Sequence, residues 1–256
     1  MTKRRLRVLF DLILLLVQKD LRVRYRGSIL GYVWSMLNPL LYMAVLSVVF
    51  SYVLKFKIDN YPVFILTGII TWNLFHQSLM QGVNSIVANG GLIRKVKVSV
   101  SLFPSATVAS VLVHFLLSLV AFLLICIFTK FSPQLSWFFL PIVLIPFVLF
   151  VWGVTLAFAS LNVFFRDVGH LLDPALQLLF YGTPVIYPLS VLPEKFAFIV
   201  KLNPLTHFVS SFRDVLYRGV IPSLSQIGIL CLLAGVSMVV GVCIYRSLRG
   251  RFVYQV

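Results

Sequence analysis

Acidic side chains are scarce in this sequence of 256 residues. Asp and Glu number seven against 22 Lys and Arg, and no two of the seven lie within four positions of each other. An enzyme that uses a metal ion or a general base would need clustered carboxylates for the metal, or a base beside a nucleophile. The sequence therefore disfavours catalysis and predicts neither catalytic residues nor a metal site.

Cysteines and nucleotide-binding motifs are also sparse. Cys126, Cys231 and Cys243 occur singly in apolar runs with no CxxC spacing, which predicts small packing residues rather than disulfides or metal ligands. The chain contains no GxxxxGK[ST] loop, so it is not expected to hold the phosphates of ATP. We predict no cofactor in this chain.

Ionisable residues inside the apolar runs of the sequence are few. A protein that moves protons or sodium ions across a membrane usually needs such groups, and these runs offer Asp173 and a few histidines. Because Pro174 follows it, Asp173 is interpreted as the N-cap of a helix start, in preference to a proton relay. The four histidines show no ligand spacing and are interpreted as ordinary polar members of the bundle.

Hydrophobic residues, in contrast, make up 60% of the chain, and the mean hydropathy is +1.01. There is too little polar surface to cover a soluble globule, so the sequence predicts an all-α integral membrane protein. The net charge of +15 would suggest nucleic acid in a soluble protein. Here the basic residues crowd the ends of apolar runs, which is typical of orientation in a bilayer and argues against nucleic-acid binding.

Six apolar runs are long enough to cross a membrane, which takes about 20 residues. The predicted spans cover residues 30–54, 62–87, 103–128, 137–161, 170–191 and 226–245. With both termini in the cytoplasm, the inner segments carry fifteen of the 22 Lys and Arg and the outer segments carry seven. The positive-inside rule therefore favours this orientation.

Residues 1–28 have a different pattern from the transmembrane domain expected over residues 29–256. Arg4, Arg7, Asp11 and Gln18 fall on one narrow polar stripe of a helix that is otherwise apolar. The pattern indicates a helix lying in the cytoplasmic interface. A hydrophobic helix packed on the bundle is equally compatible with it.

Between the fifth and sixth spans lie two apolar pieces that are each too short to span, "EKFAFIVKL" and "PLTHFVSSFRDVLYRG". Pro193 opens the first piece and Pro204 the second, as expected for proline in the first turn of a helix. We predict a re-entrant hairpin of two short helices on the outer side. An ordinary surface loop is the alternative.

Four blocks of sequence carry a resemblance to a known family. They are "DLRVRYRGSILGYVWSMLNPL" at 20–40, "NGGLIRKVKVSVSLFP" at 89–104, "FFRDVGHLLDPALQLLFYGTPVIYP" at 164–188 and "NPLTHFVSSFRDVLYRG" at 203–219. In this order and spacing they resemble the permease subunit of ABC-2-type exporters of lipid-linked polysaccharide, most closely the O-antigen exporters. The resemblance spans essentially the whole chain. A permease for a small molecule or drug, or a membrane enzyme acting on lipid-linked sugars, remains the alternative.

The resemblance implies more than the residues themselves predict. It implies six spans with an interface helix and a re-entrant hairpin, in a multi-pass protein of the bacterial inner membrane. The implied assembly is a homodimer with two copies of a separate ATPase subunit, which would hold ATP and Mg. The implied substrate is a lipid-linked polysaccharide.

Two loops are candidates for contact with that ATPase. The resemblance implies that the first acts as a coupling helix, and the second could make the other contact. The candidate residues are Leu92, Ile93, Arg94, Lys95 and Val96 in the first loop, and Arg166 and Asp167 in the second. The alternative is a basic loop that only fixes topology.

The basic residues before the first span are candidates for binding the lipid diphosphate. The guanidinium groups of Arg22, Arg24 and Arg26 suit phosphate oxygens through charge-assisted, bidentate hydrogen bonds. The alternative is that they only orient the chain and contact membrane lipids.

The block "LLFYGTPVIYPLSVLP" is interpreted as a weakened helix, because Gly182, Pro184 and Pro188 each reduce helix stability. Together with Tyr187 and the Asn203–Pro204 pair of the hairpin, these residues are the candidate exoplasmic gate. A structural kink without moving parts is the alternative.

A stripe of small and polar residues on the first span is the candidate translocation path. On a continuous helix Gly31, Ser35, Asn38 and Tyr42 would share one face, and Thr67, Thr71 and Ser78 form a similar line on the second span. Such stripes also pack helices together in lipid, which is the alternative. Tyr42 fits packing less well, because its hydroxyl needs a partner, and we predict that it lines the path.

Overall fold

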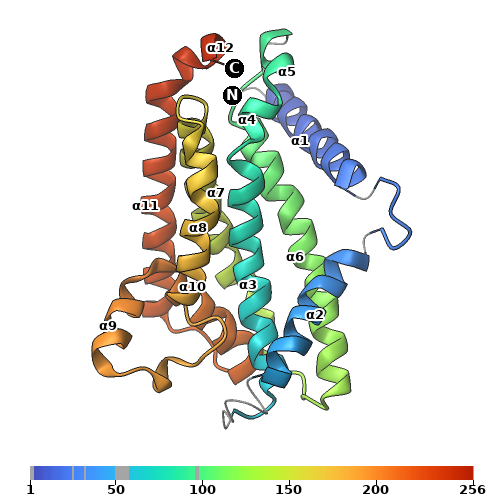
Figure 1. Cartoon of the computed structure of the whole chain (residues 1–256), viewed down its shortest axis with the longest axis vertical. Helices are drawn as coiled ribbons and strands as arrows, with labels where there is room; N and C mark the ends of the chain where they lie inside the picture. Colours follow the sequence, from blue (N-terminus) through green and yellow to red (C-terminus); the bar gives the residue numbers. More distant parts are fainter. Residues whose placement is uncertain (1–2, 25, 32, 50–57, 96–97, 256) are drawn as a thin grey trace.

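The computed structural model describes residues 3–24, 26–31, 33–49, 58–95 and 98–255. Within these ranges every regular element is a helix, which confirms the prediction of an all-α protein. The helices form an elongated bundle (Figure 1), with short helices gathered at its two ends.

Four elements are long and apolar enough to cross a membrane. They are α3 (Tyr61–Gly82), α6 (Leu102–Phe128), η2–α7 (Leu135–Phe139 and Leu140–Asn162) and α11 (Leu224–Leu248). They coincide with the predicted spans at 62–87, 103–128, 137–161 and 226–245. Hydropathy predicted these four helices because each of them is one long apolar run.

The other two predicted spans contain shorter helices. α2 (Val33–Val48) has 16 residues, or about 24 Å at 1.5 Å per residue. Gly31 lies outside this helix with a φ of +50°, so the predicted stripe cannot begin at that residue. Residues 50–54, the end of the predicted span, lie outside the described residues.

α8 (Asp167–Tyr181) begins three residues before the predicted span 170–191 and ends ten residues before its end. Its 15 residues correspond to about 22 Å. The interpretation of Asp173 and Pro174 as a helix start is wrong, since Pro174 lies inside α8 and Asp167 occupies the first turn. Pro174 has no backbone N–H to donate, so α8 lacks one helical hydrogen bond at this position.

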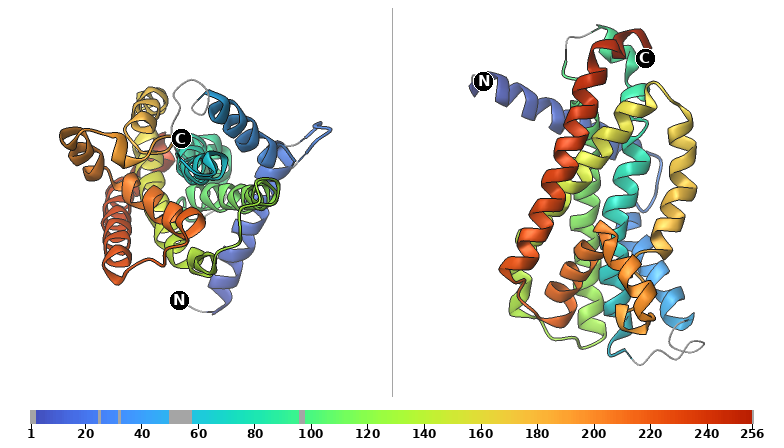
Figure 2. Two further views of the ribbon diagram at one scale, coloured as in Figure 1. Left: turned by 90° about the horizontal axis from the view of Figure 1, so that it is seen from below. Right: turned by 90° about the vertical axis from the view of Figure 1, so that its left-hand side faces the viewer.

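The first helix, α1 (Lys3–Arg24), runs obliquely across the bundle (Figure 2) and packs against α6. Near it, α4 (Ser85–Ala88), α5 (Gly90–Lys95) and α12 (Phe252–Gln255), with the short η5 (Arg249–Arg251), gather at one end of the bundle. We call this the α5 end. A small buried cluster holds it together, consisting of Ile86, Ile93, Phe103, Ala159, Val163 and Phe252.

The opposite end, called the α9 end, contains η3 (Leu189–Val191), α9 (Glu194–Leu202), α10 (Pro204–Arg213) and η4 (Asp214–Arg218). Both short helices that the sequence predicts here are present. Pro204 opens α10, and the Asn203 side chain caps it by accepting from the Leu205 amide. α10 is buried against α3, α7 and α11, whereas α9 has no buried residue.

The backbones of α7 and α11 lie in close contact. A Cβ atom built on Gly241 would lie 2.2 Å from the carbonyl oxygen of Gly153, and one built on Gly153 would lie 2.5 Å from the carbonyl carbon of Ser237. Only glycine fits at both positions. Small residues at such contacts allow two helix backbones to approach closely in a membrane.

Candidate functional site

The turn between α8 and η3 is fixed by a buried arginine of α10. Arg213, only 3% exposed, donates from Nη1 to the carbonyl of Pro184 and from Nη2 to the carbonyl of Val185, both at 2.8 Å. The guanidinium carbon lies 3.7 Å from the centroid of the Phe64 ring, a cation–π contact. Because Pro184 and Pro188 interrupt helical hydrogen bonding here, these carbonyls need a donor from elsewhere.

Two further side chains complete the anchoring of this turn. The Tyr61 hydroxyl at the start of α3 donates to the Ile186 carbonyl at 2.9 Å. The Asn203 amide donates to the Gly182 carbonyl at 3.1 Å and to Thr183 Oγ1 at 2.8 Å. We call residues 182–188, held by α3 and α10, the clamped turn.

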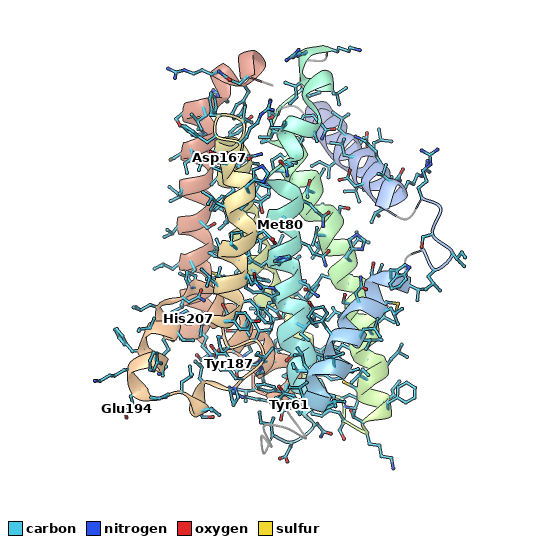
Figure 3. The ribbon with its side chains drawn as sticks, in the orientation of Figure 1. Tyr61, Met80, Asp167, Tyr187, Glu194 and His207 are labelled. Carbon is cyan, nitrogen blue, oxygen red and sulfur yellow. The ribbon has the colours of Figure 1, made fainter. Side chains whose placement is uncertain are left out.

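Figure 3 shows Tyr61 and Tyr187 at the same end of the bundle, opposite Asp167. The Tyr187 hydroxyl donates to the carbonyl of Tyr181 at 2.8 Å. α3 approaches the turn so closely that a Cβ atom on Gly68 would lie 2.4 Å from the Val185 carbonyl oxygen.

The structure therefore brings together the residues that the sequence analysis proposed as a gate. Gly182 ends α8, Pro184 is buried, and Asn203 connects Gly182 to the start of α10 at Pro204. The sequence analysis missed Arg213 and Tyr61, which hold this arrangement. A charged residue in the apolar stretch "HFVSSFRDVLY" was the available signal for Arg213.

A polar cavity lies between α2, α3 and α6, with a volume of about 350 Å³. Ser35 and Asn38 of the predicted path line it. The side chains that face them across the cavity were not proposed as site residues from the sequence. These are Asn73 and Gln77 on α3, and His114 and Ser118 on α6.

Hydrogen bonds connect α2 to α6 beside this cavity. Ser35 Oγ lies 2.8 Å from Nδ1 of His114. Ser118 Oγ lies 3.3 Å from the Ser35 carbonyl oxygen and 2.9 Å from the His114 carbonyl oxygen, so its one hydrogen is shared between the two. His114, interpreted from the sequence as an ordinary polar residue, thus positions the start of α2. Sequence spacing could not reveal this pair, because 79 positions separate its members.

The other predicted path residues lie elsewhere. Thr67 and Thr71 are buried and bond to carbonyls of their own helix. The Thr67 hydroxyl donates to the Phe64 carbonyl at 2.7 Å, and the Thr71 hydroxyl donates to the Thr67 carbonyl at 2.8 Å. Ser78 is buried as well. None of these three described residues lines the cavity. Tyr42 is 66% exposed on the surface of α2.

The basic residues near the end of α1 are exposed. Arg22 and Arg26 lie on the surface, and the side chain of Arg24 lies outside the described residues. Lys19 Nζ donates to Asn89 Oδ1 at 3.1 Å, which connects α1 to the junction of α4 and α5. A second cavity of about 330 Å³ lies beside this hydrogen bond, between α1, α4 and α6.

The predicted coupling residues that the structure describes lie at the α5 end. Leu92, Arg94 and Lys95 are exposed on α5, but Ile93 is only 8% exposed because it packs into the buried cluster at this end. Val96 lies outside the described residues. The second group, Arg166 and Asp167, is exposed at the start of α8.

Asn162, which the sequence analysis did not single out, connects three helices at the α5 end. Its amide donates to the Val83 carbonyl and to Asn84 Oδ1, both at 3.1 Å. Its oxygen accepts from the Gly169 backbone amide at 3.1 Å. Asn162 is 2% exposed and joins the ends of α3 and α7 to the first turn of α8. Asn162 thus ties the end of α3 to the start of α8, where the second predicted coupling group lies.

Comparison with known proteins agrees with this architecture. Residues 11–217 match the protein family described as ABC-2 type transporter. A Klebsiella pneumoniae protein named O-antigen export system permease protein RfbA is 36% identical over 245 residues, which cover 95% of this chain and 94% of that protein. A Myxococcus xanthus protein of the same name is 32% identical, with 94% of both chains covered.

A more distant relative is the Escherichia coli polysialic acid transport protein KpsM, which is 27% identical over 90% of both chains. The family match covers most of this chain, and the relatives cover nearly all of it. With its several long apolar helices, the chain is a multi-pass membrane permease that belongs to the ABC-2 type transporter family.

Proposed function

We propose that this chain is the transmembrane subunit of an ATP-driven exporter that moves a lipid-linked polysaccharide of O-antigen type out of the cytoplasm. The observation that carries the proposal is identity of 32–36% over nearly the whole chain with permeases named for O-antigen export. The polysialic acid relative supports polysaccharide as the broader substrate class. In this role the chain is a transporter subunit and not an enzyme.

We place the chain in a bacterial inner membrane with six crossings and both termini in the cytoplasm. The α5 end would then face the cytoplasm and the α9 end the outside. Helices α2 and α8 would supply the two short crossings. α1 would lie in the inner interface, because it runs obliquely to the long helices.

The hairpin of α9 and α10 would enter the outer leaflet. α9 exposes an apolar surface that includes Phe196, Phe198 and Ile199, each more than 60% exposed. Contact with lipid or with a second copy of the chain would cover this surface. Because the clamped turn and α10 are tied to α3, the moving part of the proposed gate would be α9.

The proposed partner is an ATPase subunit in two copies that holds ATP and Mg, bound to a dimer of this chain. The contact would use Leu92, Arg94 and Lys95 on α5, and Arg166 and Asp167 at the start of α8. These groups share one end of the bundle and are exposed there. Movement of the ATPase would reach the bundle through Asn162.

For the substrate, Arg22, Arg24 and Arg26 would bind the lipid diphosphate, and the path would follow Ser35, Asn38 and Tyr42 on α2. Arginine suits a diphosphate better than lysine because its planar fork binds two oxygens at once. Thr67, Thr71 and Ser78 would join the path only if α3 moved away from its present neighbours.

Deletion of the gene for this chain in its own bacterium tests the proposal. The sugar repeat of the polymer need not be known for this experiment. We expect loss of surface polysaccharide and accumulation of lipid-linked polymer inside the cell, both restored by the wild-type chain with its ATPase. A matched control supplies the same chain with an ATPase whose P-loop lysine is replaced by alanine. Unchanged surface polysaccharide with lost drug resistance would instead indicate a small-molecule permease.

A further inference from the structure

The polar cavity between α2, α3 and α6 has the chemistry of a sugar site. We propose that it is a saccharide-binding subsite, which holds a short stretch of the polymer during export. This inference rests on the proposed function, and it assigns to that function a site formed within a single copy of the chain.

The cavity lies where burial of polar side chains costs free energy. Asn73 and Gln77 lie one turn apart near the middle of α3, and His114 and Ser118 lie one turn apart near the middle of α6. Both helices are long enough to span a membrane, so in the proposed orientation these groups would lie far from both membrane surfaces. Polar side chains at such depth mark a packed polar network or a path for a polar ligand.

The lining is polar but carries no full charge. Among the described residues that line the cavity there is no Asp, Glu, Lys or Arg. Such a lining offers neither the cations that a phosphate needs nor the carboxylates that a metal ion prefers. Asparagine and glutamine amides each combine two donors with an acceptor, which matches the hydroxyl groups of a neutral sugar.

The lining of the cavity also includes a tryptophan. Trp34, at the start of α2, lines the cavity and remains 39% exposed. An indole offers a large apolar face for the C–H face of a sugar ring, and its N–H can donate a hydrogen bond. A few convergent polar groups beside an aromatic surface are typical of small-ligand sites.

The size and opening of the cavity are consistent with a segment of polymer. Its volume of about 350 Å³ is at the lower end of the range for ligand sites, which suits a short stretch of polymer. α2 begins only at Val33, and Ser28 of the preceding non-helical link also lines the cavity. One side of the cavity is therefore bordered by the non-helical segment before α2 and not by a helix.

Thiol labelling tests the inference on the full chain with its ATPase in lipid nanodiscs. In a background where the three cysteines are replaced by serine or alanine, Asn73→Cys is labelled with uncharged N-ethylmaleimide. The probe is oligosaccharide released by mild acid from the host's own polymer. We expect the probe to slow labelling at least fivefold. Gln134→Cys, on the loop before α7 and outside the cavity, should label at the same rate with and without the probe.

Export provides the second measurement. Gln77→Met keeps the size of the side chain but removes its amide, and we expect export to fall about tenfold for the loss of sugar hydrogen bonds at this position. Gln134→Met makes the same chemical change outside the cavity and should export normally.

The possible outcomes separate the subsite from the proposed function. Labelling that the probe does not slow would mean that the cavity holds only water, and an unreactive Asn73→Cys would mean that it is closed. Either result overturns the subsite, even where the wild type exports polymer. Protection by the probe in a chain that does not restore export would keep the subsite and reject the proposed function.

Discussion

Nη2 of Arg213 donates a 2.8 Å hydrogen bond to the carbonyl oxygen of Val185, 28 positions earlier in the chain. This bond ties the turn after α8 to α10 and incorporates it into the core of the bundle. The glycine and prolines that suggest a weak, mobile segment in the sequence are thus held by side chains from α3 and α10.

Replacement of Arg213 should destabilise the bundle strongly. We expect Arg213→Met to lower the free energy of unfolding by about 3 kcal/mol, because two buried carbonyls lose charge-assisted hydrogen bonds. Arg213→Lys should lower the free energy of unfolding by a smaller amount, since an ammonium group keeps the charge but cannot donate in the planar fork geometry. Unfolding of the purified full chain in denaturing detergent measures both changes.

Arg218→Met is the matched control for Arg213→Met. Arg218 pairs with Asp214 at 2.8 Å, but its side chain is 51% exposed. An exposed ion pair contributes about 1 kcal/mol or less. Equal losses for the two variants would show that Arg213 does not hold the turn.

Gly68→Ala should displace the clamped turn from α3. The new Cβ atom would lie 2.4 Å from the Val185 carbonyl oxygen and 2.9 Å from Nη2 of Arg213. We expect reduced stability and faster proteolysis after residue 182. Gly228→Ala is the control, because a Cβ atom there meets nothing within 4 Å. A Gly68→Ala variant as stable as the control would contradict the observed packing.

Gly241→Ala should separate α11 from α7, because its Cβ atom would lie 2.2 Å from the Gly153 carbonyl oxygen. We expect a loss of about 1–3 kcal/mol, typical of overpacking. Gly235→Ala is on the same helix with open space around it, and it should be neutral or stabilising by up to about 1 kcal/mol through higher helix propensity. Thermal unfolding of the two variants provides the comparison.

Serine substitutions at two adjacent residues of α5, Leu92 and Ile93, should have different effects. Leu92 is 43% exposed on α5, so Leu92→Ser should leave stability unchanged and reduce export at a normal rate of ATP hydrolysis. Ile93 is 8% exposed, and Ile93→Ser should lower stability by placing a hydroxyl in the buried cluster. Export and ATP hydrolysis by reconstituted complexes measure the first effect. Coupled transport by Leu92→Ser would exclude this contact.

Tyr42 tests the path along α2. We expect Tyr42→Ala to reduce polymer export while the chain still inserts and binds its ATPase, and Tyr42→Phe to keep most activity because the aromatic face remains. Val45→Ala is a control with similar exposure on the same helix. A polar thiol reagent should modify Tyr42→Cys in a transporting complex. Failure of that labelling would place the path elsewhere.

The sequence by itself determined the class of protein and most of its helices. Apolar runs predicted α3, α6, α7 and α11, because hydropathy and helix length are properties of contiguous residues. Pro193 and Pro204 predicted the starts of α9 and α10 for a similar reason: the effect of proline on the backbone is local. The same local rule was wrong at Pro174, where the surrounding bundle tolerates a proline inside α8.

Only the tertiary structure decided which polar groups meet. Ser35 and His114 are 79 positions apart, and Tyr61 and Ile186 are 125 apart, so no periodicity connects them. Arg213 appeared in the sequence as one more basic residue near a membrane surface. Its burial follows from the packing of α10 against α3. A buried polar group must find a partner, and which partner it finds depends on how distant helices pack together.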